Sequence, residues 1–212
     1  MKRDAVSPLK ASLATPEEGN GDSAAERGLV ERAASGDRDA YRILVEKYQN
    51  RVFSLVLSMV KSREDAEDIV QESFVKAYLS LKNFRGESSF YTWIYRVAYN
   101  MAIDFQRRNT RRNGVVTEPR SNNGEKEVAP VEGVASDGNP EDTVQRKELA
   151  VTLDAAMAHL SEEHRAVIML REVDGMSYSE IADVLGVSQG TVMSRIHYAK
   201  KYLQKALKEF EN

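Results

Sequence analysis

The stretch SYSEIADVLGVSQGTVMSRIHYAKKYL, residues 177–203, holds two helical patterns separated by one glycine-containing turn. Ser177 and Glu180 have the spacing of a capping box, in which each side chain bonds to a backbone N–H group of the other residue, so a short helix begins here. Gly186 predicts the end of that helix, because glycine adopts the left-handed conformation of many helix ends at no steric cost. Ser188 is a typical cap for a second, longer helix.

The two sides of this second helix differ in chemistry. Val192, Ile196 and Ala199 repeat on one side at helical spacing, whereas residues 188–208 contain five Lys or Arg and no Asp or Glu. This is the helix-turn-helix pattern, in which the second helix enters the major groove of duplex DNA. An ordinary helical hairpin with a solvated polar face is the alternative. The DNA-facing side would carry Gln189, Thr191, Ser194, Arg195, His197, Tyr198 and Lys201.

The preceding segment, residues 113–138, is rich in Gly, Pro and acidic residues and has almost no large apolar side chains. Long segments of this kind are rare inside a compact domain, so it is predicted to be a flexible acidic linker. The helical patterns on both sides and the absence of any strand pattern predict an all-α fold of two small helical domains. The predicted parts are a disordered tail (1–26), a first domain (27–112), the linker (113–138) and a second domain (139–212).

The first domain contains a second unusual stretch, FRGESSFYTWIYRVAYN, residues 84–100, with six of the sixteen aromatic residues of the chain. On a helix over residues 90–108, one side forms a sufficient core stripe, made of Ile94, Val97, Ala98, Met101 and Phe105. Tyr91, Tyr95 and Tyr99 form a second row, and for Tyr91 and Tyr95 the pattern favours the core and the surface equally.

A third row on this helix contains Trp93, Arg96, Asn100 and Arg107, and Arg108 extends its basic end. We expect this row to be exposed, because its aromatic, guanidinium and amide groups suit unpaired bases and phosphates. The basic tail of the helix would follow duplex phosphate.

Composition excludes several other classes of protein. The chain has no Cys and only three dispersed His, so a thiol nucleophile, a disulfide or a zinc site is not expected. No apolar run approaches the length of a membrane span, and no secretion signal is visible, so we expect a soluble cytoplasmic protein. We expect no enzyme activity, no catalytic residue, no metal and no cofactor.

Three motifs then resemble the bacterial sigma-70 family, specifically its extracytoplasmic-function, sigma-E-like group. They are DAEDIVQESFVKAY (65–78), FRGESSFYTWIYRVAYN (84–100) followed by D-x-x-R-R, and LREVDGMSYSEIADVLGVSQGTVMSRI (170–196). The chain departs from the common pattern at Met193, where close relatives often carry a basic residue.

The resemblance implies a transcription initiation factor with three binding surfaces. The surface for core RNA polymerase, through its β and β′ subunits, would include Asp65, Asp68, Gln71 and Glu72. With the residues predicted above, the surface for the melted −10 strand would comprise Lys76, Phe84, Arg85, Trp93, Arg96, Asn100, Arg107 and Arg108. The surface for the −35 duplex would comprise Arg171, Ser188, Gln189, Thr191, Ser194, Arg195, His197, Tyr198 and Lys201.

The resemblance also implies an anti-sigma protein that holds the chain inactive, in some cases at the inner membrane. The alternative interpretation is a helix-turn-helix regulator whose first domain senses a ligand or dimerises. Such a regulator would bind duplex promoter DNA without polymerase, and it would leave the aromatic and basic helix unexplained.

Overall fold

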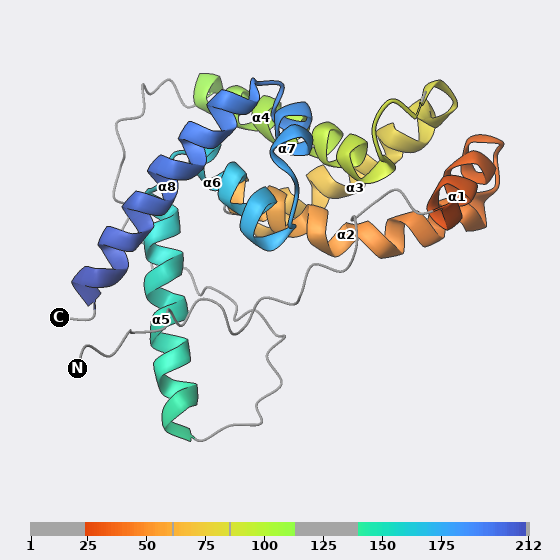
Figure 1. The fold of residues 1–212 in the computed structure, drawn as a ribbon. Helices are drawn as coiled ribbons and strands as arrows, with labels where there is room; N and C mark the ends of the chain where they lie inside the picture. The colour runs from red at the N-terminus through yellow and green to blue at the C-terminus, as the bar shows by residue number, and fades with distance from the viewer. Residues whose placement is uncertain (1–23, 61, 85, 113–139, 211–212) are drawn as a thin grey trace.

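The structure is a computed structural model that describes residues 24–60, 62–84, 86–112 and 140–210, and these ranges contain helices and no strand (Figure 1). This confirms the predicted all-α fold of two helical domains. The N-terminal half comprises α1 (Ala24–Ala34), α2 (Arg38–Val60), α3 (Arg63–Ser80), the 3₁₀ turn η2 (Leu81–Asn83) and α4 (Phe90–Arg112). The C-terminal half comprises α5 (Pro140–His159), α6 (Glu162–Ile168), the π-helical turn η3 (Met169–Val173), α7 (Tyr178–Leu185) and α8 (Gln189–Phe210).

Serine caps set the beginnings of several helices, as the sequence predicts. The backbone N–H of Asp65 donates to Ser62 Oγ at 3.3 Å at the start of α3. Ser177 and Glu180 form the complete capping box of α7, and Gly186 ends that helix with a φ of 65°. These caps satisfy backbone groups that the first and last turns of a helix leave without partners.

The helix α1 corrects the predicted tail, because it begins at Ala24, inside the range 1–26. Glu26 is buried, and its Oε2 accepts a hydrogen bond from Tyr48 Oη at 2.7 Å and an ion pair from Lys47. The apolar pattern did not predict this helix, because the buried side of α1 includes a charged residue. The predicted linker, residues 113–138, lies outside the described residues.

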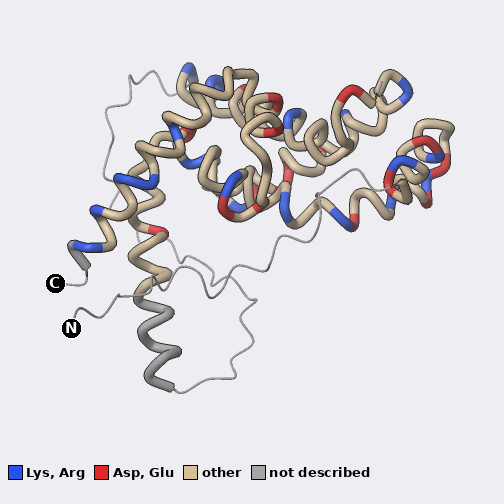
Figure 2. Tube along the Cα trace, viewed as in Figure 1, with Lys and Arg blue, Asp and Glu red and all other residues tan. Residues whose placement is uncertain are grey.

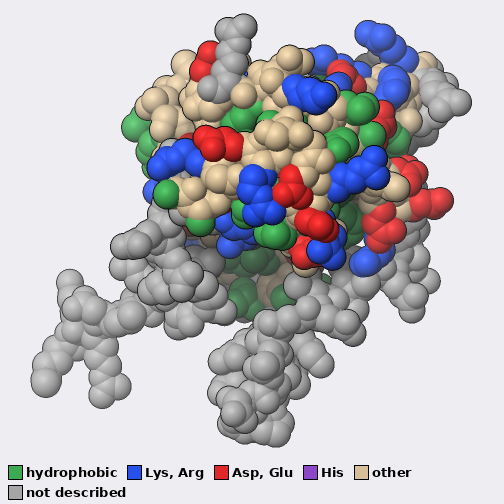
Figure 3. All heavy atoms as spheres, turned by 90° about the vertical axis from the view of Figure 1, so that its right-hand side faces the viewer, with side chains coloured by type: hydrophobic (Ala, Val, Ile, Leu, Met, Phe, Trp, Pro, Cys, Tyr) green, Lys and Arg blue, Asp and Glu red, His purple; other side chains and the backbone are tan. Residues whose placement is uncertain are grey.

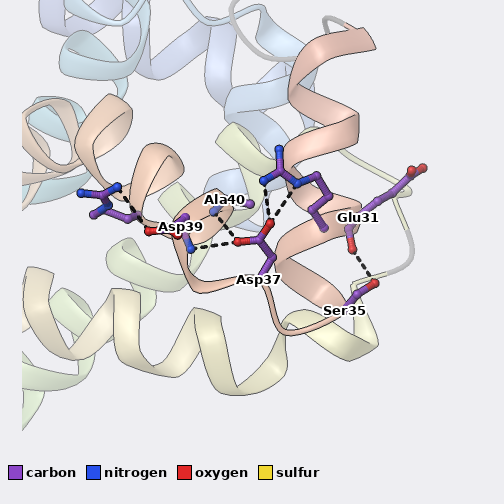
Figure 4. A network of polar contacts seen from close by, with 7 residues as sticks. Glu31, Ser35, Asp37, Asp39 and Ala40 are labelled. Carbon is purple, nitrogen blue, oxygen red and sulfur yellow. Dashed lines mark hydrogen bonds and ion pairs between the residues drawn. The ribbon is translucent and has the colours of Figure 1, made fainter.

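The turn between α1 and α2 is fixed by Asp37 (Figure 4). Its Oδ1 accepts the backbone N–H groups of Asp39 and Ala40 at 3.0 Å each, and Arg32 donates to its Oδ2 at 2.6 and 2.9 Å. The hydrogen bond from Ala40, followed by that from Arg32, lowers the pKa of Asp37. The carboxylate thus caps α2 and ties it to α1.

The two halves pack directly against each other, with α6 against α2 and α7 against α4 (Figure 1). Most of their buried apolar side chains form one continuous core, from Val30 in α1 to Ile196 in α8, and a smaller separate cluster joins α5, α6 and α8. The sequence predicted two domains but not this contact. The boundaries at 27–112 and 139–212 stay predictions. None of the helices in the described ranges combines the length and the apolar character that crossing a membrane requires.

Candidate nucleic-acid interface

The tyrosine row of α4 belongs to the core. Tyr91 and Tyr95 are fully buried and Tyr99 nearly so. The rings of Tyr91 and Tyr95 lie 4.6 Å apart, and the Tyr91 ring lies 5.4 Å from that of Tyr48 in α2. Ile94, Ala98 and Met101 are buried as predicted, whereas Val97 and Phe105 are half-buried. The inward side of α4 is therefore wider than the predicted stripe.

The opposite side of α4 is open and basic. Arg96, Asn100, Arg107 and Arg108 are exposed, and the structure gives no hydrogen bond or ion pair for Arg96 or Asn100 among the described residues. Arg107 has only a loose ion pair with Asp104, 3.8 Å between exposed groups. This side can therefore donate hydrogen bonds to a nucleic acid without first breaking internal contacts.

Trp93 lies between the open side and the core, which corrects its predicted place in an exposed row. Its ring packs 5.0 Å from that of Phe84 and 5.8 Å from that of Phe90, so the indole is half-buried. Phe84 begins the connector to α4, and Ser89 ends it by accepting the backbone N–H of Thr92 at 3.0 Å. The Phe84–Trp93 pair thus holds the start of the connector against α4. Lys76 is exposed on α3, and Arg85 lies outside the described residues.

The acidic residues of α3 lie beside an apolar groove. Asp68, Gln71 and Glu72 are exposed and Asp65 is half-buried. A groove of about 700 Å³ runs between α2 and α3, and its lining includes Gln71 and aromatic side chains of both helices. Figure 3 views the molecule from the right-hand side of Figure 1 and shows hydrophobic side chains exposed between charged ones on that face. The sequence predicted the acidic side of α3 but not the contribution of α2 to the groove, where Tyr41 and Phe53 form part of the lining.

In the C-terminal half, α7, the Gly186 turn and α8 form the predicted helix-turn-helix. Val192, Ile196 and Ala199 are buried beneath α8. Lys and Arg recur along the length of α8 (Figure 2). The predicted contact residues that lie exposed at this helix are Ser188, Gln189, Ser194, His197, Tyr198 and Lys201.

Local hydrogen bonds fix the first turns of α8. Ser188 Oγ accepts the backbone N–H of Thr191 at 3.2 Å and lies 2.9 Å from Thr191 Oγ1, and Ser194 Oγ donates to the carbonyl oxygen of Gly190 at 3.1 Å. Each hydroxyl keeps acceptor capacity, so it can still meet a base or a phosphate. The half-buried Thr191 is the least accessible of the three.

Two predicted arginines are already engaged inside the C-terminal half. Arg195 Nη2 lies 2.7 Å from Glu163 Oε2, and the Arg195 side chain is only 18% exposed. Arg171 donates to the carbonyl oxygen of Met176 at 2.6 Å, and its guanidinium lies 5.0 Å from the centre of the Tyr178 ring. These contacts within the protein fix the orientation of both guanidinium groups.

A family model described as Sigma-70 region 2 matches residues 44–112, and one described as Sigma-70, region 4, matches residues 150–203. The RNA polymerase sigma-H factor of Pseudomonas aeruginosa is 38% identical over 186 residues, covering 86% of this chain and 93% of that protein. The ECF RNA polymerase sigma-E factor of Escherichia coli is 40% identical over 179 residues, covering 82% and 89%.

Two solved structures are similar over most of the chain. CnrH, in complex with the cytosolic domain of CnrY, matches with a TM-score of 0.61 and 26% identity, covering 87% of this chain and 98% of that chain. The sigma factor RpoE from Bartonella quintana, in complex with the anti-sigma factor NepR, matches with a TM-score of 0.63 and 23% identity, covering 79% and 96%, which is a likeness of fold alone.

Proposed function

Because the chain belongs to the sigma-70 family of RNA polymerase sigma factors, in the extracytoplasmic-function group, and is a promoter-recognising factor, we propose that it binds core RNA polymerase and initiates transcription at stress promoters. It recognises the −35 and −10 elements and promotes DNA melting. The observation that carries this proposal is the open side of α4, where Arg96 and Asn100 lie exposed on the helix that follows the Phe84 connector.

The −10 strand binds along α4. Melting costs a few kcal/mol per unstacked base step, and stacking and pocket contacts at about 1–3 kcal/mol per base offset that cost. Asn100 reads a base edge, and Arg96, Arg107 and Arg108 meet phosphates. The proposed contacts of a flipped base at the connector are Lys76, Phe84 and Arg85, and Trp93 supports Phe84.

The −35 duplex binds at α8. The first turns of this helix enter the major groove, with Gln189 and Ser194 toward base edges and Lys201 toward phosphate. Met193 is 54% exposed, so it adds an apolar contact where a basic one is common in the family. The remaining proposed contacts are Arg171, Ser188, Thr191, Arg195, His197 and Tyr198.

Core polymerase binds through its β and β′ subunits, with the acidic side of α3 and the adjoining groove on the β′ coiled coil. We propose that an anti-sigma factor holds the chain inactive in the cytoplasm or at the inner membrane. In support, the fold is similar to that of the sigma factor RpoE, which was solved with the anti-sigma factor NepR. The chain performs no covalent chemistry, which belongs to the polymerase.

Run-off transcription with purified core polymerase tests this function. The expected result is specific initiation from fragments of the host genome only when the chain is present. A helix-turn-helix regulator would instead protect duplex promoter DNA without polymerase. Footprints without polymerase, combined with no initiation on any fragment, would overturn the proposal.

A further inference from the structure

The contact between the two halves contains a buried carboxyl group. Asp174 follows η3 in the C-terminal half and is only 5% exposed. Tyr95 Oη, from α4, donates to its Oδ1 at 2.7 Å, and Tyr91 Oη donates to its backbone carbonyl oxygen at 3.2 Å. Two tyrosines of the N-terminal half therefore donate hydrogen bonds to a single acidic residue of the C-terminal half.

A second polar contact crosses the same boundary. Arg165 of α6 donates from Nη1 to the carbonyl oxygen of Ser58 in α2 at 2.5 Å. Apolar residues of the C-terminal half, including Leu170, Met176 and Ile181, belong to the same core cluster as the buried residues of the N-terminal half. The halves are thus held as one closed body.

This closed body cannot serve both promoter elements at once, a step that rests on the proposed function. Elements centred at −35 and −10 lie about 25 base pairs apart, or roughly 85 Å of B-form DNA at 3.4 Å per pair. A compact body of about 150 residues has a radius of gyration of roughly 15 Å, so α4 and α8 are too close together in it. Residues 113–139, fully extended, span up to about 90 Å, which permits the halves to separate.

We propose that Asp174 and the two tyrosines form a proton-operated latch: a neutral Asp174 holds the protein in the closed form, and an ionised Asp174 favours separation of the halves. Tyr95 keeps an acceptor for its hydroxyl in both states. The states differ in the cost of keeping a negative charge in an apolar contact, which only the closed form bears.

The groups around Asp174 set the direction of the effect. Burial raises the pKa of Asp174 to about 6, against smaller opposing contributions from the Tyr95 hydrogen bond and from Arg51 of α2. On α7, Glu180 adds negative charge near Tyr91, and next to Asp174 along the chain Glu172 is paired with Lys200 at 2.7 Å. The free carboxyl has a pKa of about 3.9. The closed form therefore binds the proton more tightly, gains stability as the pH falls through about 6, and loses that gain as the pH rises.

The test measures the distance between the halves in the free protein. The chain has no native cysteine, so Lys82→Cys and Gln204→Cys, both at exposed positions in opposite halves, accept a pair of pH-insensitive dyes for energy transfer. Lowering the pH from 7.5 to 5.0 is expected to raise the closed-to-open ratio about tenfold. An energy transfer that does not change over this range would overturn the proposal.

Two variants separate the latch from other titrating groups. Asp174→Asn, a neutral side chain of the same shape, is expected to keep the closed state at both pH values and to lose the response. Asp183→Asn, which removes an exposed acid from the same half, should respond like the parent protein. A normal pH response in Asp174→Asn would overturn the latch.

Tyr95→Phe supplies an independent check, because it removes the donated hydrogen bond and should raise the open fraction at pH 5.0, with helicity unchanged by circular dichroism. A closed fraction equal to that of the parent would contradict the proposal. These measurements use no polymerase. If run-off transcription fails while the pH response is present, the proposed function is wrong and the latch stands. If run-off transcription succeeds while the energy transfer does not respond to pH, only the latch is wrong.

Discussion

The two helices proposed to bind promoter DNA, α4 and α8, hold their polar side chains in different ways. On α4 the open side carries Arg96 and Asn100 without internal partners among the described residues, while the opposite side is locked by buried tyrosines. On α8 and its neighbours the proposed contacts Ser188, Ser194 and Arg195 are already bonded within the protein. The core thus positions α4, whereas local hydrogen bonds position the contact residues of α8.

As a result, DNA binding and stability are coupled differently in the two halves. Truncating an exposed side chain on α4 removes a DNA contact and little else, because exposed positions without special contacts change stability by less than about 0.5 kcal/mol. Truncating a bonded side chain around α8 removes a DNA contact and a structural contact together. Substitutions can therefore test the comparison directly.

The largest expected effect is at Arg165, the most heavily bonded arginine among the described side chains of the C-terminal half. Its guanidinium donates to the carbonyl oxygens of Met157, Ala158 and Leu160, in addition to that of Ser58. Arg165→Ala leaves these buried acceptors without a donor and should lower the free energy of unfolding by about 3 kcal/mol. Urea denaturation followed by circular dichroism measures the loss.

The matched control for Arg165→Ala is Arg96→Ala, which removes an arginine from the open side of α4. Its free energy of unfolding should stay within about 0.5 kcal/mol of the parent value. Equal losses for the two variants would show that the arginines of the two halves are not held differently.

The next largest effect is expected at Asn100, and it concerns binding alone. A bidentate contact to a base edge is worth about 1–3 kcal/mol, so Asn100→Ala should reduce open-complex formation roughly 5- to 150-fold. Permanganate reactivity of the −10 region measures opening. Binding to core polymerase and the urea midpoint should not change. Unchanged promoter opening would remove Asn100 from the proposed surface.

Much of this comparison could be predicted from the sequence, because it depends on local patterns. Helix caps such as Ser177 involve residues three apart, and the helical period places Asn100 on a different side of the helix from Ile94. The tyrosine row could not be assigned, since an aromatic stripe fits a core and a stacking surface equally well. The structure assigns it through Tyr48, a packing partner in another helix.

The contacts that the sequence could not predict join distant parts of the chain. Tyr95 and Asp174 are 79 positions apart, on opposite sides of a linker whose composition favours independent domains. Arg195 fits a DNA contact by its position on α8, and only the fold shows that Glu163 faces it. Glu26 was assigned to a tail because a buried carboxylate does not contribute to an apolar pattern.

A smaller effect is expected at the Arg195–Glu163 pair. If Arg195 meets the −35 duplex, Glu163 competes with DNA for its guanidinium, and a partly exposed pair of this kind is worth about 0.2–1 kcal/mol. Glu163→Gln should therefore tighten binding of a −35 duplex by the holoenzyme about twofold, whereas Arg195→Ala should weaken it about fivefold. Fluorescence anisotropy at two salt concentrations measures both. Weaker binding in both variants would show that the pair has a structural role only.

Effects of similar size are expected at two serine caps, Ser177 at the start of α7 and Ser188 at the start of α8. Ser177→Ala removes the cap of α7 and Ser188→Ala that of α8, and each should lower the free energy of unfolding by about 1 kcal/mol. Only Ser188 lies exposed at the proposed DNA surface, so only Ser188→Ala should also weaken −35 binding, by a few-fold. If both variants lose equal stability and equal binding, the Ser188 hydroxyl affects DNA binding only by stabilising the helix that it caps. The contacts of α8 would then be positioned by the packing of the helix, as those of α4 are.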